Sequence, residues 1–169
     1  LTALRQDAMA RAFTEHGFST NEARKIAEEA FLVFHRARNQ VTFFPGALGV
    51  LEQLADSYQL GALTNGNADL QQIGIAELFT FHHSAETIGK RKPAPDMFLA
   101  ALASAGVDAS QAVHVGDHPL EDVHAAREHG MHAIWANLID LDWPVDLAHP
   151  RHHIHNLHEL PDLVPLFDD

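Results

Sequence analysis

The chain contains no cysteine, so neither a disulfide framework nor a thiolate metal site is possible. Positive charge is scarce as well: 11 Lys and Arg stand against 23 Asp and Glu, a net charge of −12. This balance argues against nucleic acid or an anionic membrane surface as a partner and favours cation binding. No apolar run approaches the roughly 20 residues of a membrane span. With 46% apolar residues, the composition predicts a globular, cytoplasmic protein.

Strand patterns are absent from the first 40 residues. Helical spacing predicts one helix from about residue 2 to residue 16 and a second one capped by Ser19 or Thr20. The second helix is expected to bury one stripe, made of Ile26, Ala30, Val33, Phe34 and Ala37. The two helices together form a helical hairpin. Because the chain starts with Leu1 inside the first helix, we expect it to be part of a longer gene product.

After Val41, strand and helix patterns alternate, which is typical of an α/β domain. We therefore expect a helical subdomain at residues 1–42 and an α/β core at residues 43–169. The predicted strands are 58–63, 81–84, 112–115, 132–136 and 152–155. The predicted helices are 46–56, 69–79, 95–106, 120–130 and a last one after Asn156.

Three loops of the α/β part carry polar side chains suited to chemistry. Thr64-Asn65-Gly66 follows one strand, Lys92 precedes a helix, and Asp117 with Asp122 follows another strand. Loops at the carboxyl ends of parallel strands form the ligand crevice of open sheets, and two carboxylates there suit Mg²⁺. A plainer alternative is a Gly-Asp turn followed by a first-turn helix carboxylate. A hydroxyl, a cation and a metal site together fit phosphoryl transfer.

The order of these loops resembles a known family. Three segments, Leu63-Thr64-Asn65-Gly66, Lys92-Pro93-Ala94-Pro95-Asp96-Met97-Phe98 and His114-Val115-Gly116-Asp117 with Asp122, are similar to the second, third and fourth motifs of the haloacid dehalogenase-like hydrolases. The resemblance covers roughly residues 41–167. It implies a Rossmann-like, doubly wound parallel sheet, with residues 1–42 as part of an α-helical cap that excludes water and selects the substrate.

The resemblance also implies roles for the polar residues. Thr64 would bind the phosphoryl oxygens, with backbone donors from Asn65 and Gly66, and Lys92 would neutralise the phosphoryl group. Asp117 would be a direct Mg²⁺ ligand, and Asp122 would act through water or orient Lys92. The implied function is a Mg²⁺-dependent phosphatase of a small phosphorylated metabolite, of the flavin mononucleotide or ribitylamino-uracil phosphate type, through an aspartyl phosphate.

The sequence departs from the family pattern in its first motif. No Asp-x-Asp pair precedes residue 41, and the pair at Asp140 and Asp142 comes after the fourth motif, in the wrong order. We therefore expect the first central strand and the nucleophile to be absent from these 169 residues, which would be inactive alone. We also expect a gap of roughly 9–10 Å between the strands on either side of the absent one, rather than direct pairing.

Two alternative functions stay open. The first is a 2-haloacid dehalogenase, which shares the fold but needs no metal; Asp117 and Asp122 argue against it. The second is a non-catalytic remnant that associates with another copy, so a homo-oligomer is a possible partner. A site for zinc or nickel at the histidines His152, His153, His155 and His158 is disfavoured, because strand neighbours do not complete a tetrahedron. His114 is expected to pack inside its strand rather than take part in catalysis.

Overall fold

A computed structural model describes residues 2–168, which form two compact units. The first consists of the chain up to Thr42 together with Gly66–Ala76, and the second of Phe43–Asn65 with the chain from Glu77 onward. The break at residue 42 lies where strand patterns begin in the sequence. We had placed residues 66–76 in the α/β core, whereas their contacts group them with the helical hairpin.

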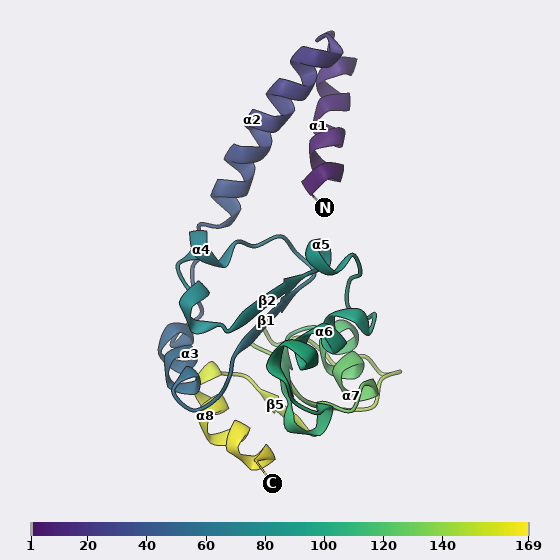
Figure 1. Ribbon diagram of the computed structural model, residues 1–169. Coiled ribbons are helices and arrows are strands. Elements are labelled where there is room, and N and C mark those ends of the chain that lie inside the picture. Colours follow the sequence, from purple (N-terminus) through teal and green to yellow (C-terminus); the bar gives the residue numbers. More distant parts are fainter. Residues whose placement is uncertain (1, 169) are drawn as a thin grey trace. The chain divides into compact units, whose positions relative to one another are not determined.

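Two long helices dominate the first unit. Helix α1 (Thr2–Glu15) and helix α2 (Thr20–Arg38) pack against each other as a hairpin (Figure 1). Ser19, one of the two caps that the sequence allows, caps α2, and it forms a capping box with Glu22. The short helix α4 (Leu70–Ile73) starts at Asp69, whose carboxylate accepts the amides of Gln71 and Gln72. It ends at Gly74, which has the left-handed conformation that a helix end favours.

The buried stripe of α2 differs from the expected one. The residues buried on this helix are Ala23, Ala27 and Phe31, while Val33 is 67% exposed. Apolar residues occur on two faces of α2, so their spacing alone does not decide between them. Small alanine side chains allow two helix backbones to approach closely, and this face is the one that the structure buries.

The second unit alternates strands and helices. Its strands are β1 (Gly61–Thr64), β2 (Phe81–Ser84), β3 (Val113–Gly116), β4 (His132–Ala136) and β5 (His152–Ile154). Its helices are α3 (Ala47–Ala55), α5 (Ala85–Ile88), α6 (Asp96–Ala105), α7 (Ala125–Glu128) and α8 (Leu160–Leu163). Short 3₁₀ turns are η1 (Ala76–Leu78, at the border of the units), η2 (Ala109–Gln111), η4 (Leu157–Glu159) and η5 (Val164–Phe167), and η3 (Pro119–His124) is a π-helix. Among residues 2–168, no helix is long and apolar enough to cross a membrane.

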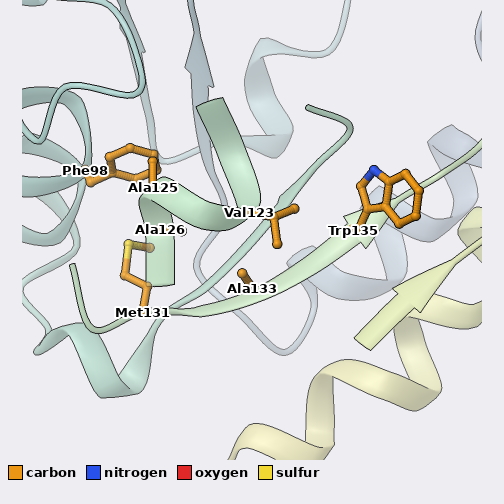
Figure 2. Close-up of a cluster of buried hydrophobic side chains, with 7 residues drawn as sticks. All are labelled: Phe98, Val123, Ala125, Ala126, Met131, Ala133 and Trp135. Atoms are coloured by element: carbon orange, nitrogen blue, oxygen red, sulfur yellow. The ribbon is translucent and has the colours of Figure 1, made fainter. Parts of the chain in front are cut away.

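Strand β4 carries the core because both of its faces are covered. Ala133 and Trp135 belong to one apolar cluster, with Phe98 of α6 and Ala126 of α7 (Figure 2). The alternate side chains of β4, Ile134 and Ala136, belong to a second cluster with residues of α3 and α8. Successive side chains of a strand point to opposite faces, so helices pack on both sides of the sheet. The fold is the Rossmann-like α/β arrangement that the sequence predicts.

The sheet is interrupted between β1 and β3. Strand β1 pairs in parallel with β2, and β3, β4 and β5 form a separate parallel sheet in that order. Residues of β1 and β3 line one cavity of about 300 Å³, together with Leu102 and Met131. The two strands therefore do not pair directly within the described part of the chain. Among the described residues, each of these strands has a strand partner on one side only.

Candidate active site

Asn65 joins the three polar loops of the second unit. Its carboxamide oxygen accepts the backbone N–H of Lys92 at 2.7 Å. Its amide nitrogen donates to the Lys92 carbonyl at 2.9 Å and to a carboxylate oxygen of Glu121 at 2.7 Å. One side chain therefore binds the loop after β1 to the Lys92 loop and to η3. This clamp brings Thr64, the last residue of β1, to the same end of the unit as Lys92 and Asp122.

A buried ion pair lies at the centre of the site. The Lys92 ammonium donates to Asp122 Oδ1 at 2.5 Å and to the Leu63 carbonyl at 3.2 Å. The side chains of Lys92 and Asp122 are 9% and 7% exposed. His114, also buried, donates from Nε2 to the same carboxylate oxygen at 3.0 Å, and the backbone N–H of His118 donates to Oδ2 at 3.1 Å. Both oxygens of Asp122 are thus used in holding the protein's own donors.

These donors determine the charge state of Asp122. Burial by itself raises the pKa of a carboxyl group, but the hydrogen bond from His114 and the positive charge of Lys92 outweigh it and hold the pKa of Asp122 well below its usual range. Asp122 is therefore a carboxylate that fixes the position of the Lys92 ammonium. It is not a group that exchanges protons near neutral pH.

The backbone at Gly116 and in η3 leaves room for the Asp122 side chain beside β3. Gly116, at the end of β3, lies so close to it that an added Cβ would come within 2.4 Å of Asp122 Cβ and Cγ. Asp122 belongs to η3, where the expected α-helix from residue 120 is a π-helix before α7 begins. His118 caps this turn, because its Nδ1 accepts the amides of Leu120 and Glu121. Single π turns of this kind are frequent at functional sites.

Comparison with known proteins identifies the family. The family model described as haloacid dehalogenase-like hydrolase matches residues 2–136, most of the chain. The chain belongs to this family. The family resemblance seen in the sequence is confirmed, and the three polar loops lie within the matched residues.

Relatives within the haloacid dehalogenase-like family include phosphatases and a dehalogenase. A 5-amino-6-(5-phospho-D-ribitylamino)uracil phosphatase of Escherichia coli (strain K12) is 33% identical over 80% of this chain and 57% of its own length. A phosphoserine phosphatase of Thermus thermophilus is 34% identical over 79% of the chain and 54% of its own length. The chain thus spans little more than half of either enzyme. A crystal structure of a 2-haloacid dehalogenase from Pseudomonas syringae pv. Tomato DC3000 superposes with a TM-score of 0.93 at 44% identity, covering 98% of this chain and 72% of that one.

The family's phosphatases generally use Mg²⁺, and the residues present suit part of such a site. Asp117 is exposed at the end of β3, and its backbone carbonyl accepts the Trp135 indole N–H at 2.9 Å. No group of three or more His, Asp or Glu side chains among residues 2–168 is arranged to hold a metal. Mg²⁺ often binds through one or two carboxylates and completes its shell with water and phosphate oxygens. Asp117 can supply one such carboxylate, and Asp122 fits the orienting role better than direct ligation, because both its oxygens are engaged.

Two residues of the site were not identified from the sequence as functional. His114 was expected only to pack in its strand, yet it holds Asp122. The second is Glu121, which accepts from Asn65 and pairs with Arg91 at 3.2 Å. Side chains alternate between the two faces of a strand, so His114 lies on the same face of β3 as Gly116, which is the face on which Asp122 packs. This alternation could have identified His114 from the sequence.

Proposed function

We propose that the protein is a Mg²⁺-dependent phosphatase of a small phosphorylated metabolite. The observation that carries the proposal is the Lys92 ammonium, held at the Thr64 end of β1 by Asp122 and the Leu63 carbonyl. A cation fixed in advance at the end of β1, where Thr64 lies, suits a reaction in which charge develops on phosphoryl oxygens.

Each residue has a distinct part in this proposal. Thr64 donates its hydroxyl to a phosphoryl oxygen, with the backbone N–H groups of Asn65 and Gly66 as further donors. Lys92 neutralises the phosphoryl charge, and Asp122 with His114 prevents the ammonium from turning away. Asp117 would hold Mg²⁺, which when bound stabilises negative charge on the phosphoryl group. The attacking carboxylate would come from an Asp-x-Asp pair on a strand, and no such pair precedes residue 41 within residues 1–169.

The test compares residues 1–169 with a version extended at its N-terminus by a strand that carries Asp-x-Asp. We expect the extended protein to hydrolyse p-nitrophenyl phosphate with Mg²⁺ and not with EDTA, and residues 1–169 to give no measurable turnover. In the extended protein Asp117→Ala should abolish the Mg²⁺-dependent rate. The control Asp142→Ala, which removes another exposed carboxylate, should leave the rate within about twofold, as an isolated surface change does. Turnover by residues 1–169 at the rate of the extended protein would refute the assignment of the nucleophile.

A 2-haloacid dehalogenase is the second candidate, favoured by the likeness to the Pseudomonas syringae structure described as such an enzyme. The same extended protein separates the two functions. Chloride release from 2-chloropropionate that EDTA does not affect, without phosphatase activity, would favour the dehalogenase. Inactivity on both substrates would favour a non-catalytic protein that associates with another copy, which sedimentation would detect.

The substrate class follows from relatives named after phosphorylated metabolites. The Escherichia coli and Thermus thermophilus proteins are named as phosphatases of a ribitylamino-uracil phosphate and of phosphoserine. We propose a substrate of this size range, with flavin mononucleotide and ribitylamino-uracil phosphate as the first compounds to assay. A panel of such phosphate esters, compared by kcat/KM, tests the assignment.

A further inference from the structure

Two arginines of the helical unit converge on one neutral oxygen. Arg5, near the start of α1, donates from Nη1 to Asn67 Oδ1 at 3.1 Å. Arg38, the last residue of α2, donates from its Nη1 to the same oxygen. Both guanidinium groups are only partly buried, whereas Asn67 is 8% exposed. Two like charges thus share a single uncharged acceptor.

The rest of Asn67 is held by other bonds, so the arginines are not needed to place it. His35 donates from Nε2 to the Asn67 backbone carbonyl at 3.1 Å. Because a carbonyl only accepts, this ring nitrogen carries the proton, and Nδ1 is free to accept from Asn39. Asn39 also accepts the backbone N–H of Asp69 at 3.0 Å. The segment that starts at Asn67 is therefore attached to α2 without either guanidinium.

Among the described residues, no carboxylate forms an ion pair with either arginine. The ion pairs of residues 2–168 all lie in the second unit and include neither Arg5 nor Arg38. Asp69, two residues from Asn67, directs its carboxylate to Gln71 and Gln72 instead, and the hydrogen bonds from Gln72 hold the pKa of Asp69 below its usual value. The amide nitrogen Nδ2 of Asn67 is buried and has no hydrogen-bond partner among the described residues. Three donor groups therefore meet here without an anion.

Helix electrostatics do not account for this arrangement. Arg38 suits the negative end of α2, but Arg5 lies near the positive end of α1, whose first turn has no acidic residue. The helical unit holds six of the chain's Lys and Arg and six of its Asp and Glu, so it is neutral while the whole chain carries −12. An anion is therefore not repelled from this unit by its own net charge.

We propose that Arg5, Arg38 and the Asn67 carboxamide form a binding site for a small oxyanion, a carboxylate or a phosphate group. Guanidinium groups bind both through paired N–H donors, and each of these arginines has further N–H groups beyond the one bonded to Asn67. The buried Nδ2 of Asn67, on the same planar carboxamide as Oδ1, is a third donor. The site is independent of the proposed phosphatase chemistry, because none of its residues takes part in it.

The test follows the arginine side-chain N–H signals of residues 1–169 by NMR. Sodium phosphate and sodium succinate are titrated separately at constant ionic strength. We expect saturable shifts of the Arg5 and Arg38 signals, assigned from Arg5→Gln and Arg38→Gln. A response to both anions identifies a general oxyanion site, and a response to phosphate alone identifies a phosphate site. Failure of both anions to give saturable shifts at these two arginines overturns the proposal.

Two matched variants distinguish a specific anion site from a general effect of positive charge on anion affinity. Arg38→Gln should weaken binding by about tenfold, the loss of one charge-assisted hydrogen bond. Arg36→Gln removes the same charge from the same helix turn at an exposed position and should leave the affinity within about twofold. Equal losses in the two variants would refute the proposal.

A further variant supplies the anion from the protein itself. Asn67→Asp places a carboxylate between the two guanidinium groups, and it should raise Tm and abolish the response of Arg5 and Arg38 to added anions. If Asn67→Asp neither stabilises the protein nor weakens anion binding, the two arginines do not form an oxyanion site.

Discussion

At the scale of single residues, the candidate active site depends on the space that Gly116 leaves empty. Asp122 occupies the position where a Cβ of residue 116 would be, and from there it reaches the Lys92 ammonium and His114. The sequence marks Gly116-Asp117 as a turn before a carboxylate. It does not reveal that the glycine is required by the close approach of residue 122, because that contact arises only when η3 folds back on β3.

Gly116→Ala should therefore displace Asp122 and destabilise the protein. An overpacked buried site costs about 1–3 kcal/mol, and the free energy of unfolding in urea measures it. The control is Gly49→Ala in α3, where an added Cβ meets nothing within 4 Å. Alanine in a helix is favoured over glycine, so this control should stabilise the protein by about 0.5–1 kcal/mol. Equal effects of the two changes would contradict the close approach.

The buried pair of Lys92 and Asp122 should show strong coupling. Asp122→Asn leaves the ammonium without a counter-charge and should cost about 3–5 kcal/mol of unfolding free energy. Lys92→Met alone leaves Asp122 with the donors from His114 and His118, so its cost should be smaller. The double variant should be more stable than the sum of the two losses predicts, and a double-mutant cycle measures the difference. Additive losses would mean that the pair does not interact in solution.

The low pKa of Asp122 predicts how stability depends on pH. A carboxyl group whose pKa is lower folded than unfolded contributes stability above its unfolded pKa, about 3.9, and this contribution is lost as pH falls toward the folded pKa. The unfolding free energy, measured with EDTA present, should therefore decline below about pH 5. It should decline less steeply in Asp122→Asn, and equal slopes would contradict the assignment.

At the scale of elements, local signals predicted most of the strands and longer helices, and packing decided the rest. Strands β2 and β4 start and end where their patterns do, because β-branched and aromatic runs bounded by polar residues are local features. The π turn of η3 was predicted as α-helix, since its form depends on how Asp122 packs against β3. The prediction of the buried face of α2 is also wrong. Two apolar faces of this helix compete, and packing against α1 selects one of them.

The capping box of α2 gives a prediction at this scale. Ser19 accepts the Glu22 amide, and the Glu22 carboxylate accepts the Ser19 amide at 3.0 Å. Ser19→Ala should destabilise α2 by about 1 kcal/mol. Glu22→Gln is the matched change, because glutamine retains the acceptor, and it should cost less. Hydrogen exchange of the first amides of α2 measures both, and an Ser19→Ala effect no larger than that of Glu22→Gln would contradict the cap.

At the scale of the whole chain, the interruption between β1 and β3 is the feature with the widest consequences. The family resemblance predicts a central strand outside residues 1–169, and the structure has two separate sheets, with residues of β1 and β3 lining one cavity. The direct pairing that would have closed the gap does not occur among the described residues. Backbone groups on free edges need partners, and a sheet edge left open invites another strand. An open position in the sheet is thus consistent with the proposal that the nucleophile lies on a strand outside residues 1–169.

Hydrogen exchange tests whether that position is open in solution. Strand β4 pairs on both sides, whereas β1 and β3 each pair on one side. In residues 1–169 the amides of β1 and β3 that face the cavity should exchange faster than those of β4. Exchange by local opening is faster by about tenfold for each 1.4 kcal/mol of lost protection. An N-terminal extension that carries the Asp-x-Asp strand should slow the β1 and β3 amides to the level of β4 and should leave β5 unchanged. Protection that rises with protein concentration, without the extension, would instead indicate a strand exchanged between copies. If β1 and β3 are protected as well as β4 in dilute residues 1–169, the two edges pair with each other in solution and the open position does not exist.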